Sequence, residues 1–457
     1  MADTEALLAD AVGARHVLTG SEIPAEYAGD ESLAATRQAP SYLVRPATAP
    51  EVAHVLRIAG RAGIPVTARG SGTGMSGGCV PRPGGITVSF ERMNRVTEVD
   101  VVNQVAVVQP GVTLDALDRQ TAEHRLCYPV RLGEPTASVG GTIATNAGGM
   151  HAVRYGVTRH HVLGVEAVLA SGEVVRTGGK YIKTSTGYDL TQLLVGSEGT
   201  LALVTEATLR LRPRAGHTTT VLAAFASPED AFRAVPPLAV GGLDPVALEY
   251  VDLLAMAAIT DDQQMGLGIS DSVRRDALAY LLVVLENHSA QRLEEDVETV
   301  GEQLLELGAA DVFVLPAAAA RNLTEARERA FWTAKAAGAD DIADIVVPRS
   351  ELHGLLAAAH AAAEDTGSLV TGCGHAGDGN VHLSVFQPDP VRREEVLRRL
   401  FRAGLARGGT VSGEHGIGRA KKPYFMNLAG PAKVELMRRI KHAFAPDGIL
   451  NPDVLFD

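Results

Sequence analysis

Three glycine-rich segments, each joined to a short apolar run, constrain the fold of this chain most strongly. The first spans residues 69–78, and the others span residues 138–149 and 187–200. Glycine tolerates backbone angles that other residues rarely adopt, so such segments can turn sharply and approach a ligand closely. Helix-like and strand-like patterns alternate around them. We therefore expect a mixed α+β domain in which the three segments line one extended ligand with backbone amides.

The first segment matches a dinucleotide-binding motif in its glycines but lacks the helix that must follow that motif. Gly72, Gly74 and Gly77 match the pattern G-x-G-x-x-G,. That pattern functions because a helix begins at its end and directs its N-terminus at the pyrophosphate. Here Pro81 and Pro83 follow, together with two more glycines, and exclude such a helix,. The sequence instead predicts a nest of backbone N–H groups that holds a phosphate without a helix.

The first half of the chain alternates predicted helices and strands. Apolar residues at helical spacing predict the helices, and runs of β-branched residues predict the strands. Residues 22–39 are polar and are expected to be irregular. Helices are expected over residues 4–12, 51–62 and 114–123, the last two capped by Thr48 and Thr113, and strands over residues 42–44, 64–68, 86–90, 104–109, 162–170, 173–176 and 201–205,.

The second half has a different order of elements. Its strand–helix–strand pattern occurs twice, which is typical of a ferredoxin-like antiparallel sheet. Such a sheet could act as a lid over a ligand held by the first domain. We expect strands over residues 218–225, 246–251, 279–286, 311–315 and 345–350, helices over residues 228–235, 290–307 and 351–364, and a helical insertion or loop over residues 254–276.

Two histidines flank a glycine-rich turn between apolar runs in residues 369–386. This pattern predicts a β-hairpin that brings His375 and His382 toward one point,. Glu414 and His415 follow in a later glycine-rich segment. Two histidines and a carboxylate suit a transition metal with open coordination positions. On the hairpin alone, an ordinary turn with two surface histidines is equally acceptable.

Charge disfavours one large class of partners. The chain of 457 residues carries 54 acidic and 42 basic residues, a net charge of −12. Nucleic-acid binding requires positive surface potential, so we expect no nucleic-acid partner. The arginines within residues 392–407 share a predicted helix, and a solvated helix face explains them,.

The cysteines and the N-terminus indicate a cytoplasmic protein. Cys79, Cys127 and Cys373 are far apart and odd in number, which fits neither a disulfide framework nor an iron–sulfur cluster,. Electrons handled here would therefore leave through an external acceptor. The acidic N-terminus lacks a signal pattern, and no apolar run is long enough to cross a bilayer,. Peripheral attachment at the inner face of the membrane through a partner is left open.

The three glycine-rich segments resemble the FAD-binding domain of the vanillyl-alcohol-oxidase flavoprotein superfamily. The resemblance runs over residues 42–214 and includes the motif Arg154-Tyr155-Gly156. It implies FAD held across two subdomains, with the pyrophosphate on the first segment. No histidine or tyrosine lies within residues 69–78, so we expect non-covalent FAD, with His151 left open as an attachment point. The cofactor-binding residues that the resemblance implies are Arg69, Gly70, Ser71, Gly72, Thr73, Gly74, Ser76, Gly77, Pro135, Thr136, Ser138, Gly140, Gly141, Thr145, Asn146, Gly148, Gly156, Glu198, Gly199, Val204 and Asn451.

Residues 375–382 and 413–418 resemble the C-terminal domain of FAD-linked 2-hydroxyacid dehydrogenases. That family includes D-lactate dehydrogenases, the flavin subunit of glycolate oxidase and D-2-hydroxyglutarate dehydrogenases. The resemblance implies that a divalent metal, zinc or manganese, binds the two hairpin histidines and the later carboxylate. It also implies a base, a carboxylate-binding arginine and an additional cation. In this numbering these residues are His375, His382 and Glu414 for the metal, His415 as base, Arg327 for the substrate carboxylate and Lys421 as the additional cation.

The implied reaction is the oxidation of a small D-2-hydroxy acid, of the D-lactate or glycolate type, to the 2-oxo acid. The metal would acidify the hydroxyl, the histidine would remove its proton, and hydride would pass to flavin N5. Hydroxyglutarate enzymes align a threonine with Phe331 and a lysine with Ile342, so apolar residues here argue against a second carboxylate. The external acceptor would be a quinone, an electron-transfer protein or an iron–sulfur subunit.

Several alternatives stay open at this stage. D-2-hydroxyglutarate dehydrogenase is one, and a non-redox FAD transferase of the ether-lipid synthase type is another, although such synthases lack the histidine and glutamate pattern. A metal-dependent hydrolase would leave the glycine segments without a role. A catalytically inert flavin-binding subunit would leave the metal ligands without a role. A homodimer is also left open.

The predicted domain organisation follows from these patterns. We expect an N-terminal helical segment (residues 1–40), an FAD-binding domain (41–215), a ferredoxin-like substrate or cap domain with the metal site (216–420), and a C-terminal segment (421–457) that returns to the FAD domain. One geometric difficulty remains. Glu414 and His415 are adjacent, and in an extended strand they would point to opposite faces. Asn380 or Asp378 is expected to orient a ligand histidine.

Overall fold

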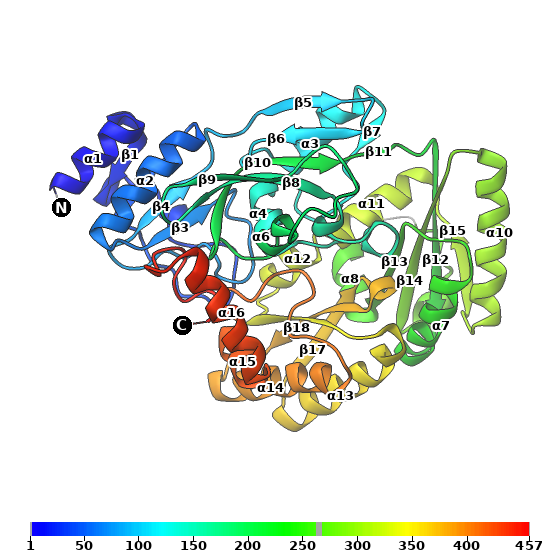
Figure 1. The fold of residues 1–457 in the computed structure, drawn as a ribbon. Helices are drawn as coiled ribbons and strands as arrows, with labels where there is room; N and C mark the ends of the chain where they lie inside the picture. The colour runs from blue at the N-terminus through cyan, green and yellow to red at the C-terminus, as the bar shows by residue number, and fades with distance from the viewer. Residues whose placement is uncertain (1, 262–266, 457) are drawn as a thin grey trace.

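The computed structural model describes residues 2–261 and 267–456. Two lobes are visible in Figure 1, and we call them the N-terminal lobe (residues 2–214) and the sheet lobe (residues 215–428). The C-terminal helices α15 (Lys422–Leu428) and α16 (Pro431–Phe444) lie along one side, beside both lobes. The observed mixture of helices and mainly antiparallel sheets confirms the α+β class.

The first sheet of the N-terminal lobe has the order β1-β2-β4-β3. Strands β2 (Tyr42–Val44), β4 (Ile86–Ser89) and β3 (Val66–Arg69) are parallel, and β1 (Val17–Thr19) is antiparallel to β2. Helix α2 (Ala49–Ala62) begins at Thr48, whose side chain accepts a hydrogen bond from the Glu51 amide. Together with α1 (Ala2–Val12) it covers the sheet with small aliphatic side chains. Strand β3 ends where the first glycine-rich segment begins, and no helix follows directly, as predicted.

The second sheet of this lobe is antiparallel, with the order β5-β6-β10-β8-β9. The strands are β5 (Val96–Asp100), β6 (Val105–Val108), β10 (Ala202–Arg210), β8 (Val162–Leu169) and β9 (Val174–Gly178). A separate pair joins β7 (Leu126–Cys127) to β11 (Arg212–Pro213). The helices are α3 (Leu114–Ala122), α4 (Val139–Thr145), α5 (Ala152–Tyr155) and α6 (Leu190–Leu194).

One local expectation about this lobe was wrong, and one helix was not predicted. The Thr113 side chain does not cap α3; its hydroxyl donates to the Asp115 carboxylate instead. The second glycine-rich segment is not all loop, because α4 forms within it. Ser138 caps this helix, because its hydroxyl accepts a hydrogen bond from the Gly141 amide,. Gly140 packs closely against Pro110: a Cβ at position 140 would lie only 2.7 Å from the Pro110 Cβ.

The sheet lobe contains one seven-stranded antiparallel sheet with the order β15-β12-β14-β13-β17-β18-β16. Its first four strands show the 4-1-3-2 order of a ferredoxin-like fold, as the strand–helix–strand pattern predicted. A second unit then extends the sheet by three strands. The bounds are β12 (His217–Phe225), β13 (Ala247–Asp252), β14 (Ala279–Asn287), β15 (Asp311–Val314), β16 (Asp341–Val346), β17 (Leu369–Gly374) and β18 (Asn380–Phe386).

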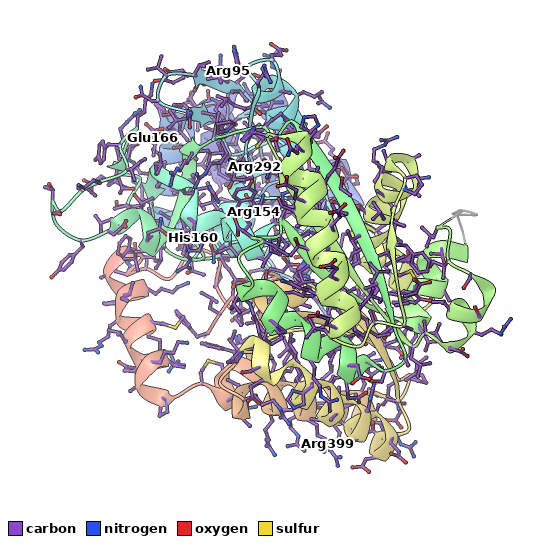
Figure 2. The ribbon with its side chains drawn as sticks, turned by 90° about the vertical axis from the view of Figure 1, so that its right-hand side faces the viewer. Arg95, Arg154, His160, Glu166, Arg292 and Arg399 are labelled. Atoms are coloured by element: carbon purple, nitrogen blue, oxygen red, sulfur yellow. The ribbon has the colours of Figure 1, made fainter. Side chains whose placement is uncertain are left out.

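Helices cover both faces of this sheet, and the alternation of side chains shows it. Val221, Ala223 and Phe225 pack on one side, whereas Leu222 and Ala224 pack on the other,. Figure 2 shows the first helical layer, with Arg292 on α10 and Arg399 on α14. That layer consists of α7 (Pro228–Val240), α10 (Ala290–Glu306), α13 (Leu352–Thr366) and α14 (Pro390–Ala406), and the opposite layer of α8 (Leu253–Asp261), α9 (Asp271–Asp276), α11 (Ala317–Glu328) and α12 (Ala330–Ala336).

Differences from the predicted boundaries have local causes. The insertion expected over residues 254–276 is helical at both ends, and its residues 262–266 lie outside the described part of the chain. Strand β16 occupies residues 341–346 rather than 345–350, because its pairing with β18 starts at Asp341, opposite Val385. Helix α7 continues through Pro236 and Pro237 to Val240.

The C-terminal segment returns to the first sheet. The Val66 amide donates to the Ile449 carbonyl, and the Asn451 amide donates to the Val66 carbonyl, both at 2.8 Å. This pairing places Asn451 beside the first glycine-rich segment. Within the described residues, no helix combines the length and apolar character needed to cross a membrane.

Candidate active site between the two lobes

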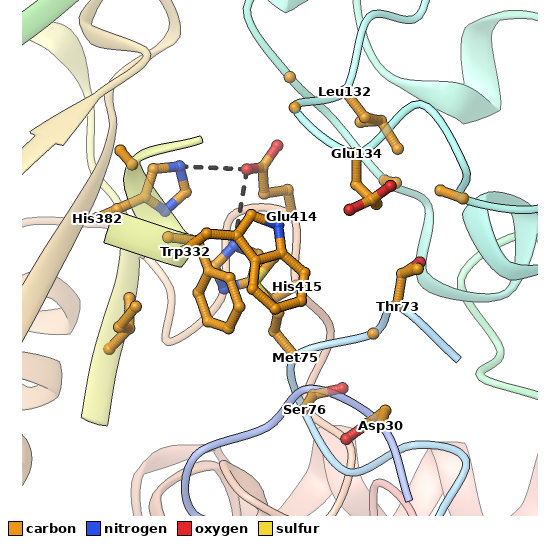
Figure 3. Close-up of a pocket in the computed structure, with 18 of the residues that line it drawn as sticks. Asp30, Thr73, Met75, Ser76, Leu132, Glu134, Trp332, His382, Glu414 and His415 are labelled. Carbon is orange, nitrogen blue, oxygen red and sulfur yellow. Dashed lines mark ion pairs between the residues drawn. The ribbon is translucent and has the colours of Figure 1, made fainter. Parts of the chain in front are cut away.

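A cavity of about 620 Å³ lies between the lobes, and both contribute to its walls. The N-terminal lobe supplies residues 70–76, most of 137–149, and Glu198 with Gly199. The sheet lobe supplies side chains from α8, α12, β17 and β18, together with Glu414 and His415. Figure 3 shows Glu414 between His382 and His415, with Thr73 and Glu134 on the other side of the cavity. The two predicted halves of the site therefore share one space.

The glycine-rich walls are held together by contacts that tolerate no extra carbon. A Cβ at Gly70 would overlap the Ser138 hydroxyl, and one at Gly72, where φ is +79°, would overlap the Arg69 guanidinium. The Ser71 hydroxyl donates to the Thr136 carbonyl at 2.6 Å. These contacts join the first and second glycine-rich segments into one continuous wall.

Just over half of the predicted cofactor-binding residues line this cavity, and the rest lie outside its lining. Arg69 donates to the Gly29 carbonyl and lies 4.9 Å from the Tyr27 ring, so it supports the first segment rather than facing the cavity. Gly148 lies behind Glu414, since a Cβ there would be 3.0 Å from Glu414 Oε2. The predicted residues that line the cavity are Gly70, Ser71, Gly72, Thr73, Gly74, Ser76, Ser138, Gly141, Thr145, Glu198, Gly199 and Asn451, and those outside its lining are Arg69, Gly77, Pro135, Thr136, Gly140, Asn146, Gly148, Gly156 and Val204.

Glu198 connects the cofactor side to the segment that carries Glu414. Its two carboxylate oxygens accept from the Ile417 and Gly418 amides, each at 2.8 Å. Burial raises the pKa of Glu198 to about 7, against the lowering effect of these two hydrogen bonds,. Asn451 donates to the Glu198 carbonyl at 2.7 Å, so the C-terminal segment takes part in the same connection.

The three predicted metal ligands meet as expected. Glu414 Oε1 lies 3.4 Å from His375 Nε2 and 3.2 Å from His382 Nε2. A tetrahedral ion with bonds of about 2.1 Å keeps its ligands roughly 3.4 Å apart, so these distances suit a metal. His382 Nδ1 and Glu414 Oε2 are buried without a hydrogen-bond partner among the described residues. The alternative of an ordinary turn with two surface histidines is wrong, because the His375 side chain is buried and the His382 side chain is largely buried.

Asp344 explains how the adjacent side chains of Glu414 and His415 can both face the cavity. Its Oδ2 accepts from three consecutive amides, those of Gly413, Glu414 and His415, at 3.0–3.2 Å. Three successive N–H groups can converge on one oxygen only if the backbone bends around it. The bend replaces an extended strand, and both side chains reach the cavity.

A second cluster, formed by Asp344, His382 and His415, also brings three potential ligand atoms within 4.8 Å of one another. We favour the first cluster, because the Asp344 carboxylate is already saturated. Besides the three amides, it accepts from the Ser412 hydroxyl and the Lys421 ammonium, and its other oxygen accepts from the Asn380 amide group. A carboxylate offers about four lone-pair positions. Lys421, His415 and His382 outweigh the effect of burial and hold the pKa of Asp344 well below 3.8.

Glu249 is the functional residue that sequence reasoning missed. It lies on β13 with a fully buried side chain, and both of its oxygens are 2.9 Å from His375 Nδ1. This contact directs Nε2 of His375 toward Glu414. Neither Asn380 nor Asp378 orients a ligand histidine as expected. The Asn380 side chain donates to Asp344, and the Asp378 carboxylate accepts from the Asn380 backbone N–H. The available signal was a lone glutamate in the apolar run of β13, which is costly to bury without partners.

Arg327 lines the cavity from the end of α11 and is buried. Its Nη2 lies 2.8 Å from Glu249 Oε2. This partner is a buried residue on the sheet, not a glutamate of the same helix. Nη2 is engaged in this ion pair, whereas the buried Nε has no hydrogen-bond partner among the described residues. Donors of this kind next to a cavity are available to a ligand carboxylate.

Three other predicted residues have distinct positions. His415 stacks on His382 with ring centroids 5.0 Å apart, and burial lowers the pKa of His415 to about 4. Lys421 does not line the cavity; it is buried behind the site, where it donates to Asp344 at 3.0 Å. His151 is also outside the cavity lining, whereas Phe331 and Ile342 belong to it.

Comparisons with known proteins match this architecture. An FAD-binding domain model matches residues 40–178, and a model for the C-terminal domain of FAD-linked oxidases matches residues 214–455. A solved 4-ethylphenol oxidase from Gulosibacter chungangensis has the same fold, with a TM-score of 0.81 and 20% identity over 100% of this chain and 97% of that one.

Curated relatives cover nearly the whole chain. An uncharacterized FAD-linked oxidoreductase of Mycobacterium tuberculosis is 53% identical over 100% of this chain and 99% of its own. A D-lactate dehydrogenase of Archaeoglobus fulgidus is 38% identical (93% of this chain, 94% of its own), and the glycolate oxidase subunit GlcD of Bacillus subtilis is 35% identical (91% and 89%). The chain therefore belongs to the FAD-linked D-2-hydroxyacid dehydrogenase family, with the fold of the vanillyl-alcohol-oxidase flavoproteins.

Proposed function

We propose that this protein oxidises a D-2-hydroxy acid, of the D-lactate or glycolate type, to the 2-oxo acid with FAD and a divalent metal. One observation carries the proposal. His375, His382 and Glu414 converge beside His415 and Arg327, on a cavity that the glycine-rich segments also line. The names of the relatives, D-lactate dehydrogenase and glycolate oxidase subunit, support the substrate class.

The donor set fits a metal such as zinc or manganese. Two imidazole nitrogens and one carboxylate oxygen are common ligands of such ions, and their separations of 3.2 and 3.4 Å suit one bound ion,. Glu249 holds His375 in the tautomer that leaves Nε2 for the ion,. When bound, the metal would supply Lewis acidity to the substrate hydroxyl.

The glycine-rich wall fits FAD. Backbone approaches at Gly70 and Gly72 leave room that side chains would fill, and the cavity reaches from there to the histidines. When bound, the flavin would accept hydride from the substrate α-carbon. Because His151 lies outside the cavity lining, we propose non-covalent FAD.

The chain's own residues have separate tasks in this proposal. The Arg327 guanidinium binds the substrate carboxylate, and the buried Glu249 limits how far it can move,. His415 accepts the hydroxyl proton, because it lines the cavity beside Glu414. Burial lowers its pKa to about 4, so it is neutral at physiological pH,. Glu414 stays ionised, since His375 and His382 outweigh burial and hold its pKa well below 4.5. Lys421 acts indirectly, by stabilising the Asp344 carboxylate beneath the bend.

Electron transfer out of the flavin requires a further partner in this scheme. We propose an external acceptor (a quinone, an electron-transfer protein or an iron–sulfur subunit), because the three cysteines are too far apart in sequence for a cluster,. A cytoplasmic location, with or without attachment to the inner face of the membrane through that partner, and a homodimer are further parts of the proposal.

The experiment is an anaerobic flavin-reduction assay on the purified holoprotein. A panel of D- and L-2-hydroxy acids should bleach the flavin absorbance with the D-enantiomers only. Chelation should abolish bleaching without releasing FAD, and added zinc or manganese should restore it. If none of the acids reduces the flavin in the metal-loaded protein, the proposed function is wrong.

A further inference from the structure

The cavity continues beyond the histidines along the floor made by β17 and β18. Side chains alternate along a strand, so every second residue faces the cavity. The cross-strand pairs become apolar with distance from the proposed metal ligands. In order these pairs are Cys373 with His382, Thr371 with Ser384, and Leu369 with Phe386, and all six residues line the cavity.

The floor is much longer than lactate requires. Leu369 and Phe386 are each four residues from the Cys373–His382 pair, which corresponds to about 13 Å along the strands at roughly 3.3 Å per residue,. Carbon–carbon bonds are about 1.5 Å long, so this span suits a zigzag chain of on the order of eight to ten carbons. Lactate would place only a methyl group at its beginning.

Two helices form an apolar roof over this floor. Helix α8 contributes Leu254, Ala258 and Ile259, and α12 contributes Phe331 and Trp332. The two aromatic rings meet edge to face with centroids 5.2 Å apart. Trp332 is labelled in Figure 3 among the residues that line the cavity. The roof residues thus share one cavity with His382 and His415.

This part of the cavity offers no second cationic side chain to a negative group, among the described residues that line it. Among the described residues that line the cavity, Arg327 is the only lysine or arginine. Lys335 lies near the two aromatic rings, but it is outside the lining and pairs with Glu31 at 2.5 Å. The Thr371 hydroxyl donates to Asp252. A dicarboxylate would bury its second charge without compensation.

The outer rim exposes large apolar side chains to water. Leu254 is 53% exposed, Leu369 49% and Trp332 38%, and all three line the cavity. Such a group is unusual on a protein surface unless something covers it. An apolar substrate tail that extends from the metal site along the floor would cover this rim, and its own apolar surface would be removed from water.

We propose that the substrate is a 2-hydroxy monocarboxylic acid with an extended apolar tail, which lies between the β17–β18 floor and the α8–α12 roof. This inference rests on the function proposed above and extends its substrate class from short 2-hydroxy acids to those with longer apolar tails. The carboxylate pairs with Arg327, the hydroxyl faces the metal ligands and His415, and the tail extends toward Leu369 and Phe386. Ile342, opposite Ser384 on β16, lies beside the middle of the tail.

The first test is a chain-length series measured with the holoprotein under anaerobic conditions. The series consists of glycolate, D-lactate, D-2-hydroxybutyrate, D-2-hydroxyhexanoate, D-2-hydroxyoctanoate and D-2-hydroxydecanoate, with D-2-hydroxyglutarate for comparison. Each buried methylene should raise kcat/KM about threefold, until the tail fills the floor. A flat or falling series from lactate to octanoate overturns the inference, although the proposed function stands if the short acids react. Failure of all the acids instead rejects the function.

The second test places a charge in the middle of the floor. Ile342→Lys should lower kcat/KM for 2-hydroxyoctanoate at least tenfold and raise it for 2-hydroxyglutarate. Val102→Lys introduces the same charge at a 92% exposed position outside the cavity lining and should leave the series unchanged. Binding of the 2-oxo products, followed by the flavin spectrum, should show the same pattern independently of turnover. Equal FAD content and Tm in the two variants exclude a folding defect. If Ile342→Lys changes neither preference, the tail does not lie on this floor.

Discussion

Glu249 and His375 form a buried pair in which the imidazole Nδ1–H donates to the carboxylate, with both oxygens at 2.9 Å. The same carboxylate lies 2.8 Å from Nη2 of Arg327. One buried charge therefore holds both the proposed metal ligand His375 and the arginine proposed to bind the substrate carboxylate. Burial disfavours the imidazolium, but Glu249 and Glu414 outweigh it and hold the pKa of His375 well above 6.5 in the metal-free protein.

Glu249→Gln should weaken metal binding 10- to 100-fold while FAD stays bound. The amide keeps the size of the side chain but cannot hold His375 as a carboxylate does, and outer ligands of this type contribute that much to affinity. Metal affinity is measured by competition with a chromophoric chelator. Glu286→Gln, on the neighbouring strand β14, is the matched control and should bind metal like the wild type. Equal affinities in both variants would remove Glu249 from this role.

Asp344→Asn should destabilise the protein by about 3–5 kcal/mol, because Lys421 would be left buried without its counter-charge,. The double variant with Lys421→Met should lose less than the sum of the two single changes. Urea denaturation of the four proteins gives the coupling energy. Arg119→Gln, which breaks an exposed i,i+4 pair with Asp115, should cost less than about 1 kcal/mol,. Additive losses at Asp344 and Lys421 would contradict the pairing.

Arg327→Lys should raise KM for the substrate at least tenfold, with a smaller change in kcat. Lysine keeps the charge but loses the planar pair of donors that a carboxylate can bind. Steady-state kinetics with an artificial acceptor separate the two constants. Arg131→Lys is the control, because Arg131 pairs with neighbouring Glu328 on the more exposed side. A fall in kcat with unchanged KM would place Arg327 in the chemical step instead.

His161 should make the protein less stable in acid. It is 1% exposed, its Nε2 donates to the Tyr155 carbonyl at 2.9 Å, and burial lowers its pKa to about 4. Between pH 6.5 and 4 the unfolded chain binds this proton and the folded chain does not. Its stabilising contribution is therefore complete above pH 6.5 and is lost as the pH falls toward 4, by about 3 kcal/mol.

The corresponding variant is His161→Phe, which keeps a ring but cannot titrate. Its free energy of unfolding should fall less than that of the wild type between pH 7 and 4, by about 3 kcal/mol. His124→Phe, at an exposed position, should retain the wild-type pH dependence. Identical pH profiles for all three proteins would show that His161 titrates normally in the folded state.

Gly72→Ala should reduce the FAD content of the purified protein. At φ +79° an alanine is strained, and its Cβ would overlap the Arg69 guanidinium that supports the first glycine-rich segment,. Gly84→Ala has nearly the same φ, +78°, with nothing within 4 Å of the added carbon. The ratio of flavin to protein absorbance, measured for both, isolates the effect of the overlap. Similar flavin loss in the two variants would mean that backbone strain alone is responsible.

Local patterns were sufficient for much of the fold. The hairpin around His375 and His382 formed where glycines interrupted two apolar runs, and the ferredoxin-like strand order followed from the succession of elements. Boundaries failed where pairing partners far along the chain decided them, as at β16, which pairs with β18 from Asp341 onward. The helix α4 was missed because its support, the contact of Gly140 with Pro110, is tertiary.

The amino-acid sequence by itself determined which side chains are available as ligands and base, since His375, His382, Glu414 and His415 lie in recognisable local motifs. Only the tertiary structure decided how they are held. Glu249 is 126 residues from His375, and Asp344 is 71 residues from the His415 amide that it accepts from. A buried carboxylate is stable only beside donors, and those donors come together only when β13, β16, β17 and β18 pair in one sheet,. The counter-charges that shape this site are therefore a property of strand order rather than of any local pattern.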